Sequence, residues 1–493
     1  MPTALASEVD IVPLLARLGV APKRVTADSR RVGHGDAFAA FPGETRDGRA
    51  FIADALVRGA AAVLWEAQGF HWRAEWRVAQ QPVDGLKAQL GGIADVIFGR
   101  PSQSLWMIGV TGTNGKTSCA QWIAQCLDAC GRRAAVMGTL GNGLVGALEP
   151  AQYTTADAAR VHEMLAGFKA AGAQAVAMEV SSHGLDQGRV NAVAFDVALY
   201  TNLTRDHLDY HGTMAAYGAA KAKLFAWPGL SACVINADDP FGRSLIDVAK
   251  LAGRKVLTYG FASADIAATA LTSSTAGIAM SVATPWGKGD VETRLFGAFN
   301  AANVLGVLGV LLVNGVPLDA ALGAIARLEP PPGRMQRLGN ADLPLVVVDY
   351  AHSPDALQKV LQALRPVVAT AQELVCVFGC GGDRDKGKRP EMGQIAGELA
   401  DRVFVTSDNP RTEEPAEIAS AIVHGIRNTA NRRWTVELDR AAAIRTAIAG
   451  AKLGDVVLIA GKGHEDYQER NGLRQHFSDA EIAQDALDAR SDA

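Results

Sequence analysis

A glycine-rich loop joins a strand pattern to a helix pattern near residue 112. Residues 106–110 are apolar, the next residues read Thr111-Gly112-Thr113-Asn114-Gly115-Lys116-Thr117-Ser118, and a helical pattern continues to Gly131. In such a loop, backbone N–H groups bind phosphate, a lysine reaches the terminal phosphates and a hydroxyl can bind Mg²⁺. The order of strand, loop and helix therefore predicts an ATP site. Its expected phosphate contacts are Gly112, Thr113, Asn114, Gly115, Lys116, Thr117 and Ser118.

The loop departs from the commonest form of this motif at one position. Val110 stands where that form has a glycine five residues before Gly115, and Gly109 lies six residues before it. The departure indicates a particular subclass of ATPase.

Two interruptions rich in proline and glycine divide the chain. Residues 99–103 read Gly-Arg-Pro-Ser-Gln, and residues 328–333 read Leu-Glu-Pro-Pro-Pro-Gly. Consecutive prolines prevent a helix from continuing. At roughly 100–200 residues per domain, a chain of this length holds about three. We therefore expect domains over residues 1–102, 103–333 and 334–493.

Short apolar runs alternate with helix-length segments in the second and third of these domains. The runs are residues 106–110, 175–178, 345–348, 375–378, 403–405 and 456–460. This alternation is typical of parallel sheets built from strand-helix-strand units. It predicts an α/β fold with a central P-loop ATPase-type sheet and a C-terminal Rossmann-like domain. Ligands of such sheets bind where the strands end.

Composition excludes several classes of protein. The 48 basic and 52 acidic residues leave a net charge of −4, which argues against a nucleic-acid binder. The sequence has no apolar stretch of the length that a membrane helix needs and no secretory signal at its start. Six cysteines in so long a chain do not form a disulfide framework. We expect a cytoplasmic monomer without nucleic-acid or membrane partners.

Three of the cysteines share a helical spacing. Cys119, Cys126 and Cys130 lie seven and four residues apart within the helix that follows the loop. Zinc sites usually pair cysteines at closer spacing and add ligands from elsewhere. We expect three small buried side chains here.

Several motifs in order along the chain resemble the Mur ligases, which are ATP-dependent amide ligases that build the peptidoglycan peptide. The phosphate loop has the form seen in that family. The other matching segments are residues 179–185 (EVSSHGL), 201–212 (TNLTRDHLDYHG), 299–303 (FNAAN), 333–335 (GRM), 349–355 (DYAHSPD) and 461–465 (GKGHE). The resemblance covers all three expected domains.

The tetrapeptide Asp408-Asn409-Pro410-Arg411 is similar to one in family members that add diaminopimelate. There the arginine faces the distal carboxylate of the amino acid, and lysine-adding members lack it. An arginine fork suits a carboxylate. The resemblance implies ligation of meso-2,6-diaminopimelate to UDP-N-acetylmuramoyl-L-alanyl-D-glutamate through an acyl phosphate. The products would be UDP-MurNAc-tripeptide, ADP and phosphate.

The resemblance also implies roles for individual residues. Lys116, Glu179, His207 and Lys221 match catalytic positions. Thr117, Glu179, His207 and Lys221 match the Mg²⁺ ligands, with Lys221 carried as a carbamate (N6-carboxylysine). A carbamate replaces a repelling ammonium with an anion that can help to hold Mg²⁺.

The remaining matches concern the three substrates. Those for ATP are Asn300, Asn303, Arg334, Asp349 and His352. Those for the UDP substrate are Ser29 within Asp28-Ser29-Arg30, and Thr154, Thr155, Ser181, Gln187 and Arg189. Those for diaminopimelate are Arg389, Asp408, Asn409, Pro410, Arg411, Gly461 and Glu465.

Three alternatives stay open. The first two are a ligase that adds L-lysine and a folylpolyglutamate synthetase, which shares the loop and the acyl-phosphate chemistry. The third is a nucleotide-switched binding protein that ligates nothing. Arg411 argues against lysine, and the substantial first domain with Asp28-Ser29-Arg30 argues against the folate enzyme.

Overall fold

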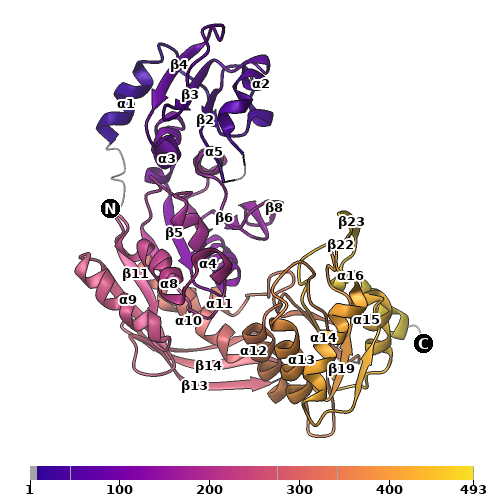
Figure 1. Ribbon diagram of the computed structural model, residues 1–493. Coiled ribbons are helices and arrows are strands. Elements are labelled where there is room, and N and C mark those ends of the chain that lie inside the picture. Colours follow the sequence, from indigo (N-terminus) through magenta and orange to yellow (C-terminus); the bar gives the residue numbers. More distant parts are fainter. Residues whose placement is uncertain (1–7, 45, 275, 341, 492–493) are drawn as a thin grey trace. The chain divides into compact units, whose positions relative to one another are not determined.

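The computed structural model describes residues 8–44, 46–274, 276–340 and 342–491 (Figure 1). Its contacts divide the chain into two compact units, Met1–Tyr259 with Gly309–Gly315, and Gly260–Leu308 with Val316–Ala493. Mainly parallel sheets covered by helices occur in an N-terminal, a central and a C-terminal part. The expected α/β fold class is thus confirmed. The domain boundaries after residues 102 and 333 stay predictions.

The N-terminal sheet belongs to the first unit and is buried on both faces. Its strands are, in sheet order, β1 (Val25–Thr26), β2 (Ala37–Ala40), β3 (Ala62–Glu66) and β4 (Ala79–Val83), all paired in parallel. Its helices are α1 (Glu8–Ala16), α2 (Ile52–Val57) and α3 (Leu86–Ile97), with 3₁₀ turns at Ser29–Arg31, Gly48–Phe51 and Pro101–Ser104. Val63 packs with Ile52 of α2, whereas the next residue, Leu64, packs with Leu86 of α3. This alternation follows from the period of two along a strand.

The central sheet carries the phosphate loop at the end of β5. Its strands are, in sheet order, β12 (Lys255–Gly260), β11 (Ala232–Asn236), β10 (Val197–Tyr200), β5 (Trp106–Thr111), β9 (Ala175–Glu179), β6 (Ala134–Gly138), β7 (Gly141–Leu144) and β8 (Ala147–Glu149). Pairing is parallel from β12 to β6, and β7 and β8 add an antiparallel edge. Its helices are α4 (Lys116–Ala129), α5 (Ala158–Ala170), α6 (Ser182–Asp186), α7 (Leu208–His211), α8 (Met214–Ala222) and α9 (Pro240–Leu251), with a 3₁₀ turn at Lys223–Ala226. The order of the strands places the carboxyl ends of β10, β5 and β9 side by side.

Helix α5 contributes side chains to two hydrophobic cores. Ala158 and Ala159, in its first turn, pack into the core of the N-terminal sheet together with Leu86 of α3. Val161 and Leu165 pack into the core of the central sheet. The helix therefore joins these two parts of the first unit.

The second unit begins with three strands that pair antiparallel with one another. Its strands are β13 (Ile266–Ser274), β14 (Gly277–Thr284) and β15 (Gly287–Thr293), followed by helices α10 (Ala298–Val313) and α11 (Leu318–Ile325). Gly309–Gly315 within and just after α10 belong to the first unit. The sequence pattern did not indicate this antiparallel part.

The C-terminal sheet is wound on both faces. Its strands are, in sheet order, β16 (Gln336–Leu338), β17 (Leu345–Asp349), β21 (Val456–Ala460), β18 (Leu374–Phe378), β19 (Arg402–Val405) and β20 (Trp434–Val436), parallel except for β16. The other elements are α12 (Pro354–Leu364), α13 (Lys388–Leu399), α14 (Pro415–Arg427), α15 (Arg440–Ala449), α16 (Asp479–Ser491), a 3₁₀ turn at Arg365–Val367 and the hairpin β22 (Tyr467–Arg470) and β23 (Leu473–His476). Leu458 packs in the core with α12 to α14, whereas its neighbour Ile459 packs with α15 and α16, which lie side by side in Figure 1. Helices therefore cover both faces of this mostly parallel sheet, which is the arrangement of a Rossmann-like domain.

Each apolar run expected to be a strand lies in one, namely β5, β9, β17, β18, β19 and β21. The helical pattern after the loop is α4. Among the described residues, no helix combines the length and the apolar character needed to cross a membrane.

Candidate active site

The end of β10 braces the phosphate loop. Thr201 Oγ1 donates to the carbonyl oxygen of Asn114 at 2.6 Å, and the N–H of Asn114 donates to Asn202 Oδ1 at 3.0 Å. Gly112 has φ 151°, and a Cβ there would lie 1.9 Å from Thr201 Oγ1. Only glycine permits this close approach. Gly115, with φ 87°, precedes the first residue of α4.

Two lysines donate to the same carbonyl oxygen of the loop. Lys116 Nζ lies 2.9 Å from the oxygen of Gly112 and 2.8 Å from that of Thr113. Lys221 Nζ, on α8, lies 2.8 Å from the oxygen of Gly112 and is 1% exposed. Burial and then the charge of Lys116 hold the pKa of Lys221 well below its usual value. The ammonium of Lys116 favours an anion at this loop.

Glu179 ends β9 as a buried carboxylate beside the loop. Thr117 Oγ1 donates to Glu179 Oε2 at 2.9 Å, and the N–H of Thr139 donates to Oε1 at 2.8 Å. A Cβ on Gly138 would lie 2.1 Å from Oε1, so a glycine on β6 makes room for the carboxylate. A hydroxyl and a carboxylate are hard oxygen donors of the kind that Mg²⁺ takes. The two residues therefore fit a Mg²⁺ ion.

His207 lies on the loop before α7, in a left-handed conformation with φ 52°. Its ring centroid lies 4.9 Å from that of His183 and 6.0 Å from that of Tyr217, whose hydroxyl contacts Thr113 Oγ1 at 3.1 Å. Burial lowers the pKa of His207, and the charge of Lys116 contributes in the same direction. His207 and Lys221 thus lie within electrostatic reach of Lys116, but only Thr117 and Glu179 of the expected metal ligands contact each other. Over the ranges that the structure describes, no group of three or more His, Cys, Asp or Glu residues is arranged to hold a metal.

The residues expected to contact the muramoyl peptide lie together beside Glu179. Thr155 Oγ1 donates to the carbonyl oxygen of Glu179 at 2.9 Å and lies 3.1 Å from Ser181 Oγ. Arg189 donates to Thr155 O at 2.8 Å and to Gln187 Oε1 at 2.8 Å. Thr154 joins the group through a contact of 3.0 Å between its Oγ1 and that of Thr139.

Ser29 begins the 3₁₀ turn after β1, and its neighbours form an ion pair. Asp28 accepts from the backbone and the guanidinium of Arg30, whose side chain is 80% exposed. The hydrogen bond to Asp28 raises the pKa of Arg30, and interaction with Tyr153 adds to this.

In the second unit, loops after β19 and β21 bring most of the expected amino-acid contacts together. Asn409 Nδ2 donates to Glu465 Oε2 at 2.8 Å. Gly461, with φ 117°, lies where a Cβ would be 2.6 Å from Asp408 Oδ2. These loops therefore carry two carboxylates and an amide, acceptors that suit an ammonium group.

Arg411 takes a left-handed conformation with φ 51°, which is unfavourable for arginine. Its N–H donates to Glu469 O at 3.1 Å, and its own carbonyl accepts from Asn471 at 2.7 Å, so the hairpin β22–β23 holds the backbone. Its Nη1 donates to Gly382 O at 2.6 Å. Such strain, held by surrounding structure, is common at functional sites.

Arg389 lies beneath this loop with its guanidinium already engaged. It is 3% exposed, and its two terminal nitrogens donate to the two oxygens of Glu413 at 3.0 and 2.9 Å. The hydrogen bonds from Arg389 are the main cause that lowers the pKa of Glu413 to about 2. The expected contact of Arg389 with substrate stays a prediction, and Glu413 was not among the expected residues.

The remaining expected ATP contacts lie in two places in the second unit. Asp349, at the end of β17, accepts from the N–H groups of Met335 and Ala351 at 2.7 and 2.8 Å. Burial raises its pKa to about 6. The guanidinium of Arg334 lies 4.5 Å from the centroid of the Tyr350 ring. The other contacts are His352, which is exposed after β17, and Asn300 and Asn303, which are buried on α10.

Comparisons with known proteins identify the family of the chain. Family models of the Mur ligase middle domain, the Mur ligase glutamate ligase domain and the Mur ligase family catalytic domain match residues 110–311, 333–463 and 23–96. The UDP-N-acetylmuramoyl-L-alanyl-D-glutamate--2,6-diaminopimelate ligase of Chromobacterium violaceum is 52% identical over 477 residues, covering 97% of this chain and 96% of that protein. The enzyme of the same name from Pseudomonas aeruginosa is 54% identical over 476 residues, covering 95% of each. The chain belongs to the Mur ligase family.

A solved structure supports the same assignment. It is of a UDP-N-acetylmuramoyl-L-alanyl-D-glutamate--2,6-diaminopimelate ligase that is 39% identical to this Mur ligase. The match covers 95% of both chains with a TM-score of 0.71.

Two buried cations of this Mur ligase were missed by sequence reasoning. Lys462 is 0% exposed and donates to Asn409 Oδ1 at 3.1 Å and to Glu465 Oε2 at 3.2 Å. It therefore fixes the orientation of the amide and the carboxylate. Lys462 lies within residues 461–465, a segment that resembles the family, and this position could have identified it from the sequence. Arg440, in the first turn of α15, had no local signal.

Arg440 holds the starts of the loops that follow β19 and β21. It donates to the carbonyl oxygens of Ser407 and Ala460 at 3.3 and 3.0 Å, immediately before Asp408 and Gly461. It also forms two hydrogen bonds of 2.7 Å with Asp479, and both side chains are 0% exposed.

We expect the variant Arg440→Ala to lower the free energy of unfolding by about 3–5 kcal/mol, because it leaves Asp479 buried without its cation. Chemical denaturation measures this change. Arg433→Ala is the control, since Arg433 pairs with Glu373 while 56% exposed and such a pair is worth about 0–1 kcal/mol. Equal losses in the two variants would contradict a special role for the buried pair.

The cysteines of this Mur ligase differ in one respect from the expectation. Cys119 and Cys126 are buried, but Cys130 is exposed. The reason is that α4 ends at Ala129, so Cys130 is its C-cap and lies beyond the buried face. The prediction of three buried side chains was therefore wrong for Cys130.

Proposed function

We propose that this Mur ligase joins meso-2,6-diaminopimelate to UDP-N-acetylmuramoyl-L-alanyl-D-glutamate in peptidoglycan synthesis, with ATP as co-substrate. The observation that carries the proposal is identity of 52% and 54% over nearly the whole chain to enzymes named for this reaction. The products are UDP-MurNAc-tripeptide, ADP and phosphate.

The reaction proceeds in two displacements. An oxygen of the D-glutamyl carboxylate bonds to the γ-phosphorus of ATP as the bond to the β,γ-bridging oxygen breaks, which releases ADP. The amine nitrogen of diaminopimelate then bonds to the acyl carbon, phosphate leaves with the electrons of the broken C–O bond, and the nitrogen loses a proton. Neither step needs an oxidant or a reductant.

The residues around the phosphate loop position and neutralise charge, which phosphoryl transfer mainly requires. N–H groups from Gly112 to Ser118 cradle phosphate, and Lys116 neutralises its oxygens. Thr117 and Glu179 would hold Mg²⁺, with His207 as a further proposed ligand. When bound, Mg²⁺ supplies positive charge to the phosphate oxygens.

Lys221 is proposed to carry a carbamate. Only an uncharged amine adds to carbon dioxide, and burial beside Lys116 favours that form because it lowers the pKa of Lys221. The anionic carbamate would in turn be attracted by Lys116.

The other proposed contacts follow the described groups. Asp408 and Glu465 face the ammonium group of diaminopimelate, and Arg411 its distal carboxylate, while a carboxylate at Arg389 would share the guanidinium with Glu413. Asn409, Pro410 and Gly461 complete that site. The UDP substrate is proposed to contact Ser29, Thr154, Thr155, Ser181, Gln187 and Arg189, and ATP to contact Asn300, Asn303, Arg334, Asp349 and His352.

We place the reaction in the cytoplasm and propose that the chain acts as a monomer. Six free thiols suit a reducing compartment. The exposed large apolar side chains of the described residues come from many different elements. Such single exposed side chains do not mark an interface.

We expect phosphate release from ATP to require both UDP-N-acetylmuramoyl-L-alanyl-D-glutamate and meso-diaminopimelate. The assay compares meso-diaminopimelate, L-lysine and no amino acid, and mass spectrometry identifies the tripeptide product. Activity with lysine in place of diaminopimelate would keep the family and overturn the substrate. Release without any amino acid would favour a nucleotide switch, and no release at all would contradict the ligase.

A further inference from the structure

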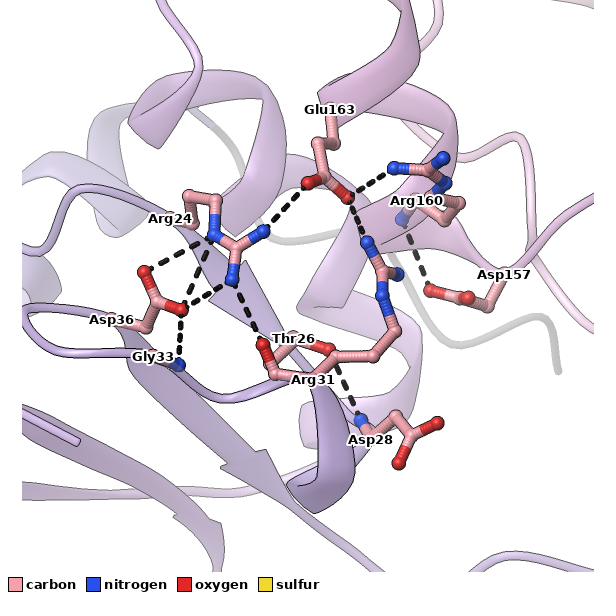
Figure 2. Close-up of polar contacts among 9 residues, drawn as sticks. All are labelled: Arg24, Thr26, Asp28, Arg31, Gly33, Asp36, Asp157, Arg160 and Glu163. Carbon is pink, nitrogen blue, oxygen red and sulfur yellow. Dashed lines mark hydrogen bonds and ion pairs between the residues drawn. The ribbon is translucent and has the colours of Figure 1, made fainter. Parts of the chain in front are cut away.

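Glu163 joins the two halves of the proposed UDP-substrate site, one near Ser29 and one near Thr154. It lies on α5, the helix shared by the N-terminal and central cores. Figure 2 shows three arginines converging on its carboxylate. Arg24 Nη1 lies 3.0 Å from Oε1, and Arg31 Nη2 and Arg160 Nη1 lie 2.6 and 2.9 Å from Oε2.

On the N-terminal side, the arginines are fixed to the turn that contains Ser29. Arg24 donates to Asp36 Oδ2 at 2.6 Å and to the carbonyl oxygen of Arg31 at 2.9 Å (Figure 2). Asp36 is 3% exposed and also accepts from the N–H of Gly33 at 2.8 Å. Arg31 is the last residue of the turn Ser29–Arg31. Movement of Glu163 would therefore be transmitted to this turn.

On the central side, the same helix begins beside the residues proposed to contact the muramoyl peptide, which are Thr154, Thr155, Ser181, Gln187 and Arg189. Asp157 is the N-cap of α5 and accepts from the N–H of Arg160 at 3.1 Å. It follows Thr155 by two residues, and Thr155 contacts Glu179 at the end of β9 and Ser181 at the start of α6. The helix thus fixes the second half of the site.

The balance of charges makes Glu163 the residue on which the contact between the N-terminal arginines and α5 depends. Three arginines face two carboxylates, Glu163 and Asp36, and only Glu163 contacts all three. Burial tends to raise the pKa of Glu163, but the hydrogen bonds from Arg31 and Arg160 outweigh it and lower the pKa overall. Without this carboxylate, the guanidinium groups of Arg31 and Arg160 would repel each other.

We propose that Glu163 is a positioning residue for the UDP substrate. It holds the Ser29 turn at the spacing from Thr154 and Thr155 at which one molecule can engage both. A ligand that binds two sites gains affinity only when their separation fits it, and fixing that separation beforehand removes an ordering cost. The inference rests on the proposed function, because it assumes that the UDP substrate spans these two groups.

The test is Glu163→Gln in the full-length chain. We expect the KM for UDP-N-acetylmuramoyl-L-alanyl-D-glutamate to rise about tenfold, with kcat and the KM values for ATP and diaminopimelate within twofold. Arg31→Gln, which breaks the same contact from the other side, should give a similar rise, and the double variant should be no worse than either. Glu373→Gln is the matched control, because Glu373 pairs with Arg433 and Arg402 away from the proposed substrate residues.

An unchanged KM for the UDP substrate would overturn the inference. So would an equal rise in all three KM values, or a fall in kcat alone with a lower thermal midpoint, because a merely structural role predicts these. If the unaltered protein ligates nothing, the proposed function fails. Calorimetric binding of the UDP substrate then decides the inference by itself, since equal Kd values for the parent and Glu163→Gln would reject it.

Discussion

Replacing Lys116 by alanine should lower kcat on the order of a thousandfold, because one preorganised electrostatic contact to the reacting group is worth about 10²–10³. Lys116 Nζ is held over the phosphate loop by the carbonyl oxygens of Gly112 and Thr113. Lys221 also donates to this loop, but it is buried. Formation of ADP in a single turnover, with both other substrates saturating, measures the effect.

The same substitution should leave the fold intact. While Lys221 is an unmodified amine, it shares one carbonyl oxygen with Lys116, so removal of the Lys116 ammonium relieves repulsion between the two side chains. We therefore expect a thermal midpoint no lower than that of the parent. Lys250→Ala, on the exposed face of α9, is the control for a lost lysine. Activity within tenfold of the parent would show that Lys116 does not contact the transferred phosphate.

Removing the guanidinium of Arg411 should raise the KM for diaminopimelate about a hundredfold, since a hydrogen-bonded contact to a charged group is worth up to about 3 kcal/mol. The KM for ATP should stay within twofold. Steady-state kinetics of Arg411→Ala with each substrate varied in turn measures both values. The activity that the parent has with L-lysine, which lacks the distal carboxylate, should change little in this variant.

The left-handed backbone at Arg411 calls for a second variant. Asparagine tolerates this conformation better than most residues, so Arg411→Asn keeps the loop while it removes the guanidinium. We expect the same rise in KM as with alanine. Recovery of the parental KM in Arg411→Asn would assign the effect to the backbone. Equal loss of diaminopimelate and ATP binding would contradict the proposed contact.

The parts of this fold that sequence patterns predict are those whose signals are local. The apolar runs that became β5, β9, β17, β18, β19 and β21 are bounded by polar or glycine-rich loops, and the phosphate loop has its strand and helix on either side. By contrast, β13, β15 and the edge strands β7 and β8 lack long continuous apolar runs, because only part of their surface is buried. Their antiparallel pairing was therefore missed.

The candidate site shows the same division. Glu179 follows a strand and was identifiable from that position. Arg440 and Glu413 act on residues about 20 to 40 positions away along the chain, and their own surroundings in the sequence resemble ordinary helix and loop segments. The pairing of Arg389 with Glu413 likewise depends on tertiary structure. The spacing of residues along the sequence does not predict such contacts.

The shared helix α5 affects how pieces of this chain can be exchanged with those of relatives. A graft cut near residue 102 would import a foreign N-terminal sheet while keeping the native Ala158 and Ala159 that fill its core, and the native Glu163 that its arginines must meet. The segments that should be exchanged together are instead the residues up to 98 and helix α5. A chimaera built from both segments keeps the contacts of the N-terminal sheet and its arginines with α5.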